Sequence, residues 1–226
     1  MRKYAMPKVA YILLMMILLC LSIGYTYAYF SAIDKVKGSL ILHSINVSWR
    51  DGGSNDARIP TLFDNPTTNE NEAMSIAITG ELVRGGYTQI KARDINNNIK
   101  NIKLKISNFG TTGAYCRIKI TGTYLDKNNE QKVCEDGWLQ LALSDDDSYD
   151  LITENGWTYY NGYYYYGADI NSLTELSRNS GLTVADYLYL SSTSSADVYG
   201  ATLNIVLTLE AVQSSNNAYK SVWNLV

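Results

Sequence analysis

The chain has 226 residues, of which 46% are apolar, and it carries 19 basic against 22 acidic side chains. This length and apolar content suit one domain with a sizeable core and exclude a chain that is disordered throughout. The small acidic excess argues against nucleic acid or an anionic membrane surface as a partner. The single histidine, His43, excludes sites that need two histidines.

The first 28 residues predict a signal peptide. A start with three basic residues precedes the apolar run Val9–Ile23, which is shorter than the ~20 residues of a membrane-spanning helix. The small residues Thr26 and Ala28 predict cleavage between Ala28 and Tyr29. The alternative is an uncleaved anchor, which would then be the chain's only contact with a membrane.

The expected mature chain, residues 29–226, is a single exported domain. Removal of residues 1–28 takes away three basic residues and no acidic one, so 16 basic and 22 acidic residues remain, a net charge of −6. We expect a soluble protein that is secreted or held at the cell surface. Cys116 and Cys134 then form an even pair in a compartment where disulfides persist, which predicts a bridge between them; two free thiols are the alternative.

Alternation of apolar and polar residues is the main structural signal in the mature chain. Between Lys100 and Asn108, for example, Ile102, Leu104 and Ile106 alternate with polar side chains, which is typical of a strand with one buried face. Similar patterns predict strands within residues 41–49, 116–121 and 201–211. Turn signals separate these strands. The sequence therefore predicts an all-β fold, a jelly-roll-like β-sandwich with short helical insertions.

The sharpest local feature is an aromatic hairpin signal in Trp157–Tyr166. The central Asn-Gly dipeptide predicts a type I′ turn, which pairs Tyr160 with Tyr163, Tyr159 with Tyr164, and Trp157 with Tyr166. In this register Tyr160, Tyr163 and Tyr165 lie on one face and form a possible surface aromatic patch. The patch could bind glycans or another subunit, while cross-strand packing within the hairpin is the third reading.

Three other segments lack a strand pattern. Alternation breaks between Asp169 and Leu190, and Ser172–Glu175 resembles a capping box, so we expect one or two short helices there. The serine-rich run Ser191–Ser195 predicts a surface loop, and residues 51–74 predict a second, longer one.

Motifs that carry chemistry are nearly absent, so we predict no catalytic residue, no cofactor and no metal site. His43 falls on the apolar side of its predicted strand, where a core histidine is favoured over a ligand or base. The carboxylates of Asp145–Asp147 and Asp150 could hold calcium, but they lack the spacing of an EF-hand, and a solvated loop is favoured.

Four stretches resemble a known family. They are Gly24–Ser31 around the cleavage site, Lys37–Leu40, Ile106–Gly110, and Leu207–Gln213 followed by Trp223. Together they are similar to the TasA/camelysin family, exported proteins of Gram-positive bacteria that a dedicated signal peptidase processes. The resemblance extends from the signal segment to the C-terminal strand.

The resemblance implies a jelly-roll subunit of an extracellular biofilm-matrix fibre that polymerises with copies of itself. Each subunit would donate its mature N-terminal segment, Tyr29–Lys37, as a strand to the next subunit, because an extended peptide can satisfy the backbone groups of an open sheet edge. The larger apolar side chains of this segment belong to Tyr29, Phe30, Ile33 and Val36.

Two other functions stay open at this point. A monomeric surface adhesin would bind glycans through the tyrosine hairpin without assembling. Camelysin relatives have also been classed as metallopeptidases, and such a peptidase is the minor alternative.

Overall fold

The computed structural model describes residues 45–53, 56–60, 74–78, 84–94, 96–145, 150–198, 201 and 203–225. All of these belong to one compact unit, residues 43–226, of the two into which the chain divides. The signal segment, the donor segment 29–37 and His43 lie outside the described residues. The all-β prediction is confirmed, because the described chain folds mainly into strands that pair in antiparallel sheets.

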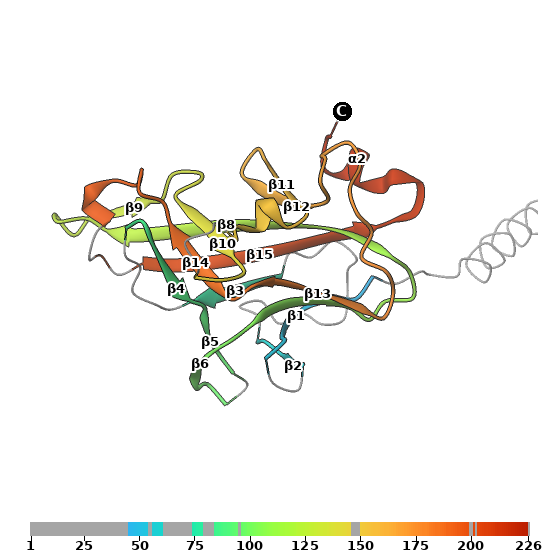
Figure 1. Cartoon of the computed structure of the whole chain (residues 1–226), viewed down its shortest axis with the longest axis horizontal. Helices are drawn as coiled ribbons and strands as arrows, with labels where there is room; N and C mark the ends of the chain where they lie inside the picture. The colour runs from blue at the N-terminus through green and yellow to red at the C-terminus, as the bar shows by residue number, and fades with distance from the viewer. Residues whose placement is uncertain are drawn as a thin grey trace, which may run out of the picture. The chain divides into compact units, whose positions relative to one another are not determined.

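The largest sheet has the strand order β11-β12-β8-β15-β3, and β9 pairs with the far end of β8. Its two long central strands, β8 and β15, run side by side in Figure 1. The strands are β3 (Met74–Ile78), β8 (Ala114–Leu125), β9 (Gln131–Val133), β11 (Trp157–Tyr160), β12 (Tyr163–Tyr166) and β15 (Leu203–Gln213).

A second sheet has the order β13-β7-β1-β2, and two further strand pairs, β10-β14 and β5-β6, complete the sheets, with β4 beside β14. Their bounds are β1 (Val47–Asp51), β2 (Ala57–Arg58), β4 (Gly86–Gln89), β5 (Lys91–Arg93), β6 (Ile99–Asn101), β7 (Leu104–Asn108), β10 (Leu139–Ala142), β13 (Ser180–Ala185) and β14 (Tyr187–Leu190).

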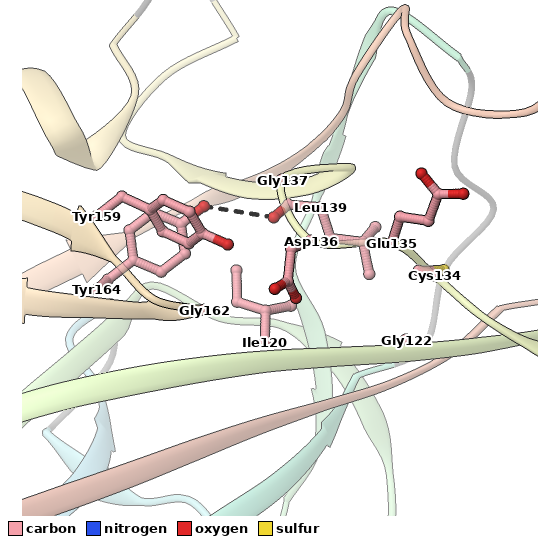
Figure 2. A pocket seen from close by; sticks show the side chains of 10 residues that line it. All are labelled: Ile120, Gly122, Cys134, Glu135, Asp136, Gly137, Leu139, Tyr159, Gly162 and Tyr164. Carbon is pink, nitrogen blue, oxygen red and sulfur yellow. Dashed lines mark hydrogen bonds between the residues drawn. The ribbon is translucent and has the colours of Figure 1, made fainter.

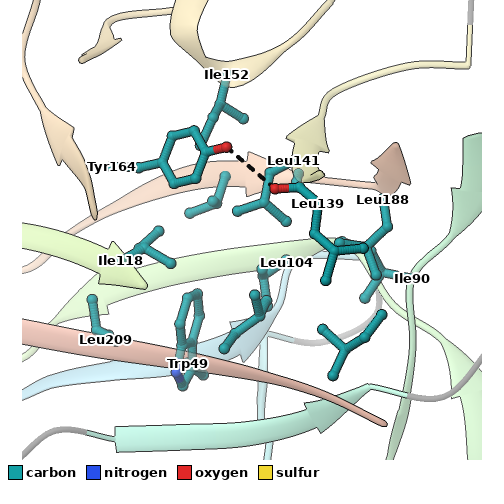
Figure 3. Packing of buried hydrophobic residues seen from close by; sticks show 14 of the residues in the cluster. Trp49, Ile90, Leu104, Ile118, Leu139, Leu141, Ile152, Tyr164, Leu188 and Leu209 are labelled. Atoms are coloured by element: carbon teal, nitrogen blue, oxygen red, sulfur yellow. Dashed lines mark hydrogen bonds between the residues drawn. The ribbon is translucent and has the colours of Figure 1, made fainter. Parts of the chain in front are cut away.

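One hydrophobic core collects the inward side chains of these sheets (Figure 3). The fully buried Trp49 and Leu104 come from the second sheet, Ile118 comes from β8, and Leu141 comes from β10. Apolar residues on one parity of β7, β8 and β15 meet in this core, since successive side chains of a strand point to opposite faces. Burial of each such side chain stabilises the fold by about 1.5–3 kcal/mol.

The predicted strand from Lys100 to Asn108 is two strands. β6 ends at Asn101 and β7 begins at Leu104. Between them, Ile102 is buried and its N–H donates to the carbonyl oxygen of Ile90 (2.9 Å), so the chain changes partner at this point. Alternation continues across the break, which is why the sequence does not reveal it.

The helices predicted between Asp169 and Leu190 are wrong. The N–H of Thr174 donates to the carbonyl of Tyr166, and Leu176 exchanges two backbone hydrogen bonds with Ala114. These partners are distant in sequence, and they take the backbone groups that a helix would use. The segment continues as β13 and β14.

Short helical turns lie elsewhere among the described residues. They are η1 (Ile152–Glu154), η2 (Ala196–Val198), η3 (Ser215–Asn217) and α2 (Ala218–Val222). The predicted loop Ser191–Ser195 is a loop, although Ser191 and Ser194 are buried rather than exposed.

Candidate functional site

The aromatic hairpin β11-β12 forms in the predicted register. Tyr160 pairs with Tyr163, Tyr159 with Tyr164, and Trp157 with Tyr166. Positive φ angles at Asn161 (49°) and Gly162 (81°) make the turn, as a type I′ connection requires.

The predicted surface patch on this hairpin is not a surface. Tyr165 is 2% exposed and Tyr163 is half-buried, so Tyr160, at 51%, is the one well-exposed ring of the three. Tyr165 packs in a small second cluster with Tyr219 and Trp223, beside α2. Sequence parity correctly groups the three tyrosines on one face, but the C-terminal segment covers that face.

Arg117 of β8 joins this second cluster to the sheet. Its guanidinium lies 3.9 Å from the ring centre of Tyr163 and 4.8 Å from that of Trp223. It also pairs with Glu210 on β15 and donates to the hydroxyl of Tyr165 (3.1 Å). Cation–π contacts and a cross-strand ion pair therefore hold the hairpin and the C-terminal turn against β8 and β15. Sequence reasoning misses Arg117 because it occupies an ordinary polar position of its strand.

The predicted disulfide is wrong: Cys116 and Cys134 are free thiols. The N–H of Cys134 donates to the carbonyl of Gly122 (2.8 Å), and its Sγ lies 2.9 Å from the position that a Cβ on Gly122 would take. Cys116 is six residues from Gly122 along the same strand, about 20 Å at ~3.3 Å per residue. A disulfide requires Cα atoms within about 7 Å.

The outer edge of β3 is a candidate assembly site. β3 pairs with β15, β5 lies near it without pairing, and no described strand pairs with its other edge. The sequence of β3, Met-Ser-Ile-Ala-Ile, contains neither a charged residue nor a proline. Charge and proline are the usual devices that keep an edge strand from pairing with another chain.

The hydrogen-bond pattern of the largest sheet shows which backbone groups of β3 face outward. The Gly122 carbonyl bonds to Cys134, so even-numbered residues of β8 direct their N–H and C=O groups away from β15. The registers between β8 and β15 and between β15 and β3 contain no break, so the same alternation holds in all three strands. It directs the N–H and C=O groups of Ile76 toward β15. Ser75 and Ala77 therefore present two N–H and two C=O groups at the outer edge.

A small notch lies at the opposite side of β8, where two strands share one edge. β12 pairs with β8 at Arg117 and Ile118, and β9 pairs from Thr123 onward. Neither strand reaches Ile120, whose N–H and C=O face the interval between them. The notch has a volume of about 20 Å³, enough for one water-sized group.

The lining of this notch is polar on one side and aromatic on the other (Figure 2). The Asp136 carboxylate points toward Ile120 and Gly162, whereas the Glu135 carboxylate points away. The ring of Tyr159, 38% exposed, packs against Tyr164 at 4.9 Å between ring centres. Burial and the charge of Asp136 raise the pKa of Tyr159, so its phenol stays protonated at neutral pH.

The residues of the described part of the chain form neither a metal-binding group nor a membrane-spanning helix. There, no three His, Cys, Asp or Glu side chains gather in a group that could hold a metal ion. Asp150 accepts a hydrogen bond from the Ser144 hydroxyl (2.8 Å), while Asp146 and Asp147 lie outside the described residues. No helix within the described ranges is long and apolar enough to cross a membrane.

Within the described ranges, the antiparallel sheets and the edge of β3 that no described strand pairs with define an all-β protein with a backbone surface suited to strand addition. A scan against protein-family models, a search of curated proteins and a search of solved structures find no match to this chain.

Proposed function

We propose that the protein is an exported structural subunit that polymerises into extracellular fibres of the kind found in biofilm matrices. In this proposal a dedicated signal peptidase cleaves between Ala28 and Tyr29. Residues 29–37 of one copy then add as a strand to another copy. The sheets would form a jelly-roll-like sandwich. The resemblance of four stretches to the TasA/camelysin family supports the proposal.

The observation that carries the proposal is the outer edge of β3. It offers the outward N–H and C=O groups of Ser75 and Ala77 on a strand without charge or proline. Four main-chain hydrogen bonds at ~1 kcal/mol each would contribute about 4 kcal/mol. Burial of Tyr29, Phe30, Ile33 and Val36 would add ~25 cal/mol per Å² of apolar area.

The first test removes the donor. The mature chain, residues 29–226, should form filaments visible by electron microscopy, and the chain 38–226 should stay a folded monomer by circular dichroism and sedimentation. A synthetic peptide of residues 29–37 should bind the shortened chain. Filaments formed by the shortened chain under the same conditions would contradict strand donation.

The second test alters the acceptor. Ala77→Pro removes an outward N–H and spares the hydrogen bonds to β15, so we expect peptide binding to weaken at least tenfold. Ala77→Val retains the N–H and is the matched control. Equal binding of the peptide by both variants would show that another edge accepts the strand.

A further inference from the structure

The notch beside the hairpin suggests a second binding site. It lies on the hairpin face opposite the predicted aromatic patch. The predicted patch faces α2, whereas Tyr159 lies on the opposite face of the hairpin, beside Asp136. We propose that the notch and the Tyr159 ring form a binding site for a neutral saccharide, independent of fibre assembly.

The polar groups of the notch match a hydroxyl group. Ile120 offers both an N–H donor and a C=O acceptor, and the Asp136 carboxylate adds a strong acceptor. Asp136 forms no ion pair with any cation among the described residues. A sugar hydroxyl both donates and accepts, so it satisfies these groups together, and its size suits the volume of about 20 Å³.

The aromatic wall suits the remainder of a sugar ring. Tyr164 supports Tyr159 from behind, at a tilt of 55°, and donates its own hydroxyl to the Leu139 carbonyl (3.4 Å). Tyr159 is 38% exposed, and an aromatic face packs well against the C–H groups of a pyranose. One hydroxyl would enter the notch while the ring lies over Tyr159.

Other ligand classes match the notch less well. Calcium takes six to eight oxygen ligands, whereas one carboxylate faces the notch and the other, Glu135, points away. An ammonium group has donors alone and would meet the N–H of Ile120 unfavourably. Anionic sugars would meet repulsion from Asp136 and Glu135, both exposed.

The test is calorimetric titration of the mature chain with cellohexaose and with chitohexaose, and with oligogalacturonate as the anionic probe. We expect binding of at least one neutral oligomer and none of the anionic one. Tyr159→Ala and Asp136→Ala should each weaken binding at least tenfold.

Two matched controls lie beside these positions. Tyr160→Ala removes a more exposed ring from the other hairpin face, and Glu135→Ala removes the carboxylate that points away. Both should change affinity less than twofold. The proposal is overturned if the unaltered chain binds neither neutral oligomer, if the controls lose binding equally, or if calcium or butylammonium binds at Asp136 in place of sugars.

Discussion

At the scale of single residues, burial decides the chemistry of the two cysteines. Cys116 is fully buried, which raises the pKa of its thiol to about 12, and partial burial raises that of Cys134 to about 11. A thiol must ionise before it reacts as a nucleophile. Both side chains therefore serve the fold as small apolar groups rather than as reactive ones.

The raised pKa of Cys116 predicts a pH dependence of stability. The unfolded thiol ionises from about pH 9 and the folded one only near pH 12, so the folded state keeps its proton longer and stability falls as the pH rises between these values. By pH 10.5 the loss from Cys116 is about 2 kcal/mol. Urea unfolding of Cys116→Ala should show a decline between pH 8 and pH 10.5 that is shallower by this amount. Parallel declines in the variant and the unaltered chain would contradict it.

At the scale of elements, local sequence and distant contacts contribute unequally. The hairpin β11-β12 has a turn that needs positive φ at both central positions, which Asn161 and Gly162 supply. The five-residue helix α2 is too short to be stable alone. Its neighbour Trp223 anchors it, through contacts with Tyr165 and Arg117.

This anchor predicts an effect of Trp223→Ala on the C-terminal segment. Loss of a buried indole should lower the free energy of unfolding by about 3 kcal/mol, measured by urea denaturation. Amide hydrogen exchange in α2 should accelerate as well. Val222→Ala, at a 52% exposed neighbour, is the control and should change stability by less than about 0.5 kcal/mol. Similar effects of both variants would show that Trp223 is not the anchor.

At the scale of the whole molecule, net charge governs how copies of the expected mature chain meet. Each copy would carry a net charge of −6, since 16 basic and 22 acidic residues follow Ala28. Like charges repel over a distance that shrinks from ~30 Å at 0.01 M ionic strength to ~3 Å at 1 M. The proposed main-chain hydrogen bonds and apolar contacts depend little on salt.

Filament growth of the mature chain should therefore be faster at high salt. We expect the elongation rate, followed by light scattering, to rise severalfold between 0.01 M and 0.5 M sodium chloride. The chain 38–226 should show no growth at either salt concentration. Slower growth at high salt would mean that attractive ion pairs between copies dominate the contact.

The fold class, several strands and the hairpin register follow from patterns among neighbouring residues. Alternation acts between neighbouring residues, and the Asn-Gly turn fixes which tyrosines face each other, so these features depend on little else. The outer edge of β3 could not be predicted from local alternation, because the direction of its backbone groups depends on the registers of three strands together.

The remaining features depend on contacts between separate segments of the chain. Backbone partners at Tyr166 and Ala114 replaced the predicted helix near Ser172, and the position of β9 placed Cys134 beside Gly122 instead of Cys116. The C-terminal segment buried Tyr165, and the interval between β12 and β9 created the notch at Ile120. Each of these outcomes joins residues from separate segments of the chain. A local sequence pattern does not specify which other segment will satisfy a backbone group or cover a face.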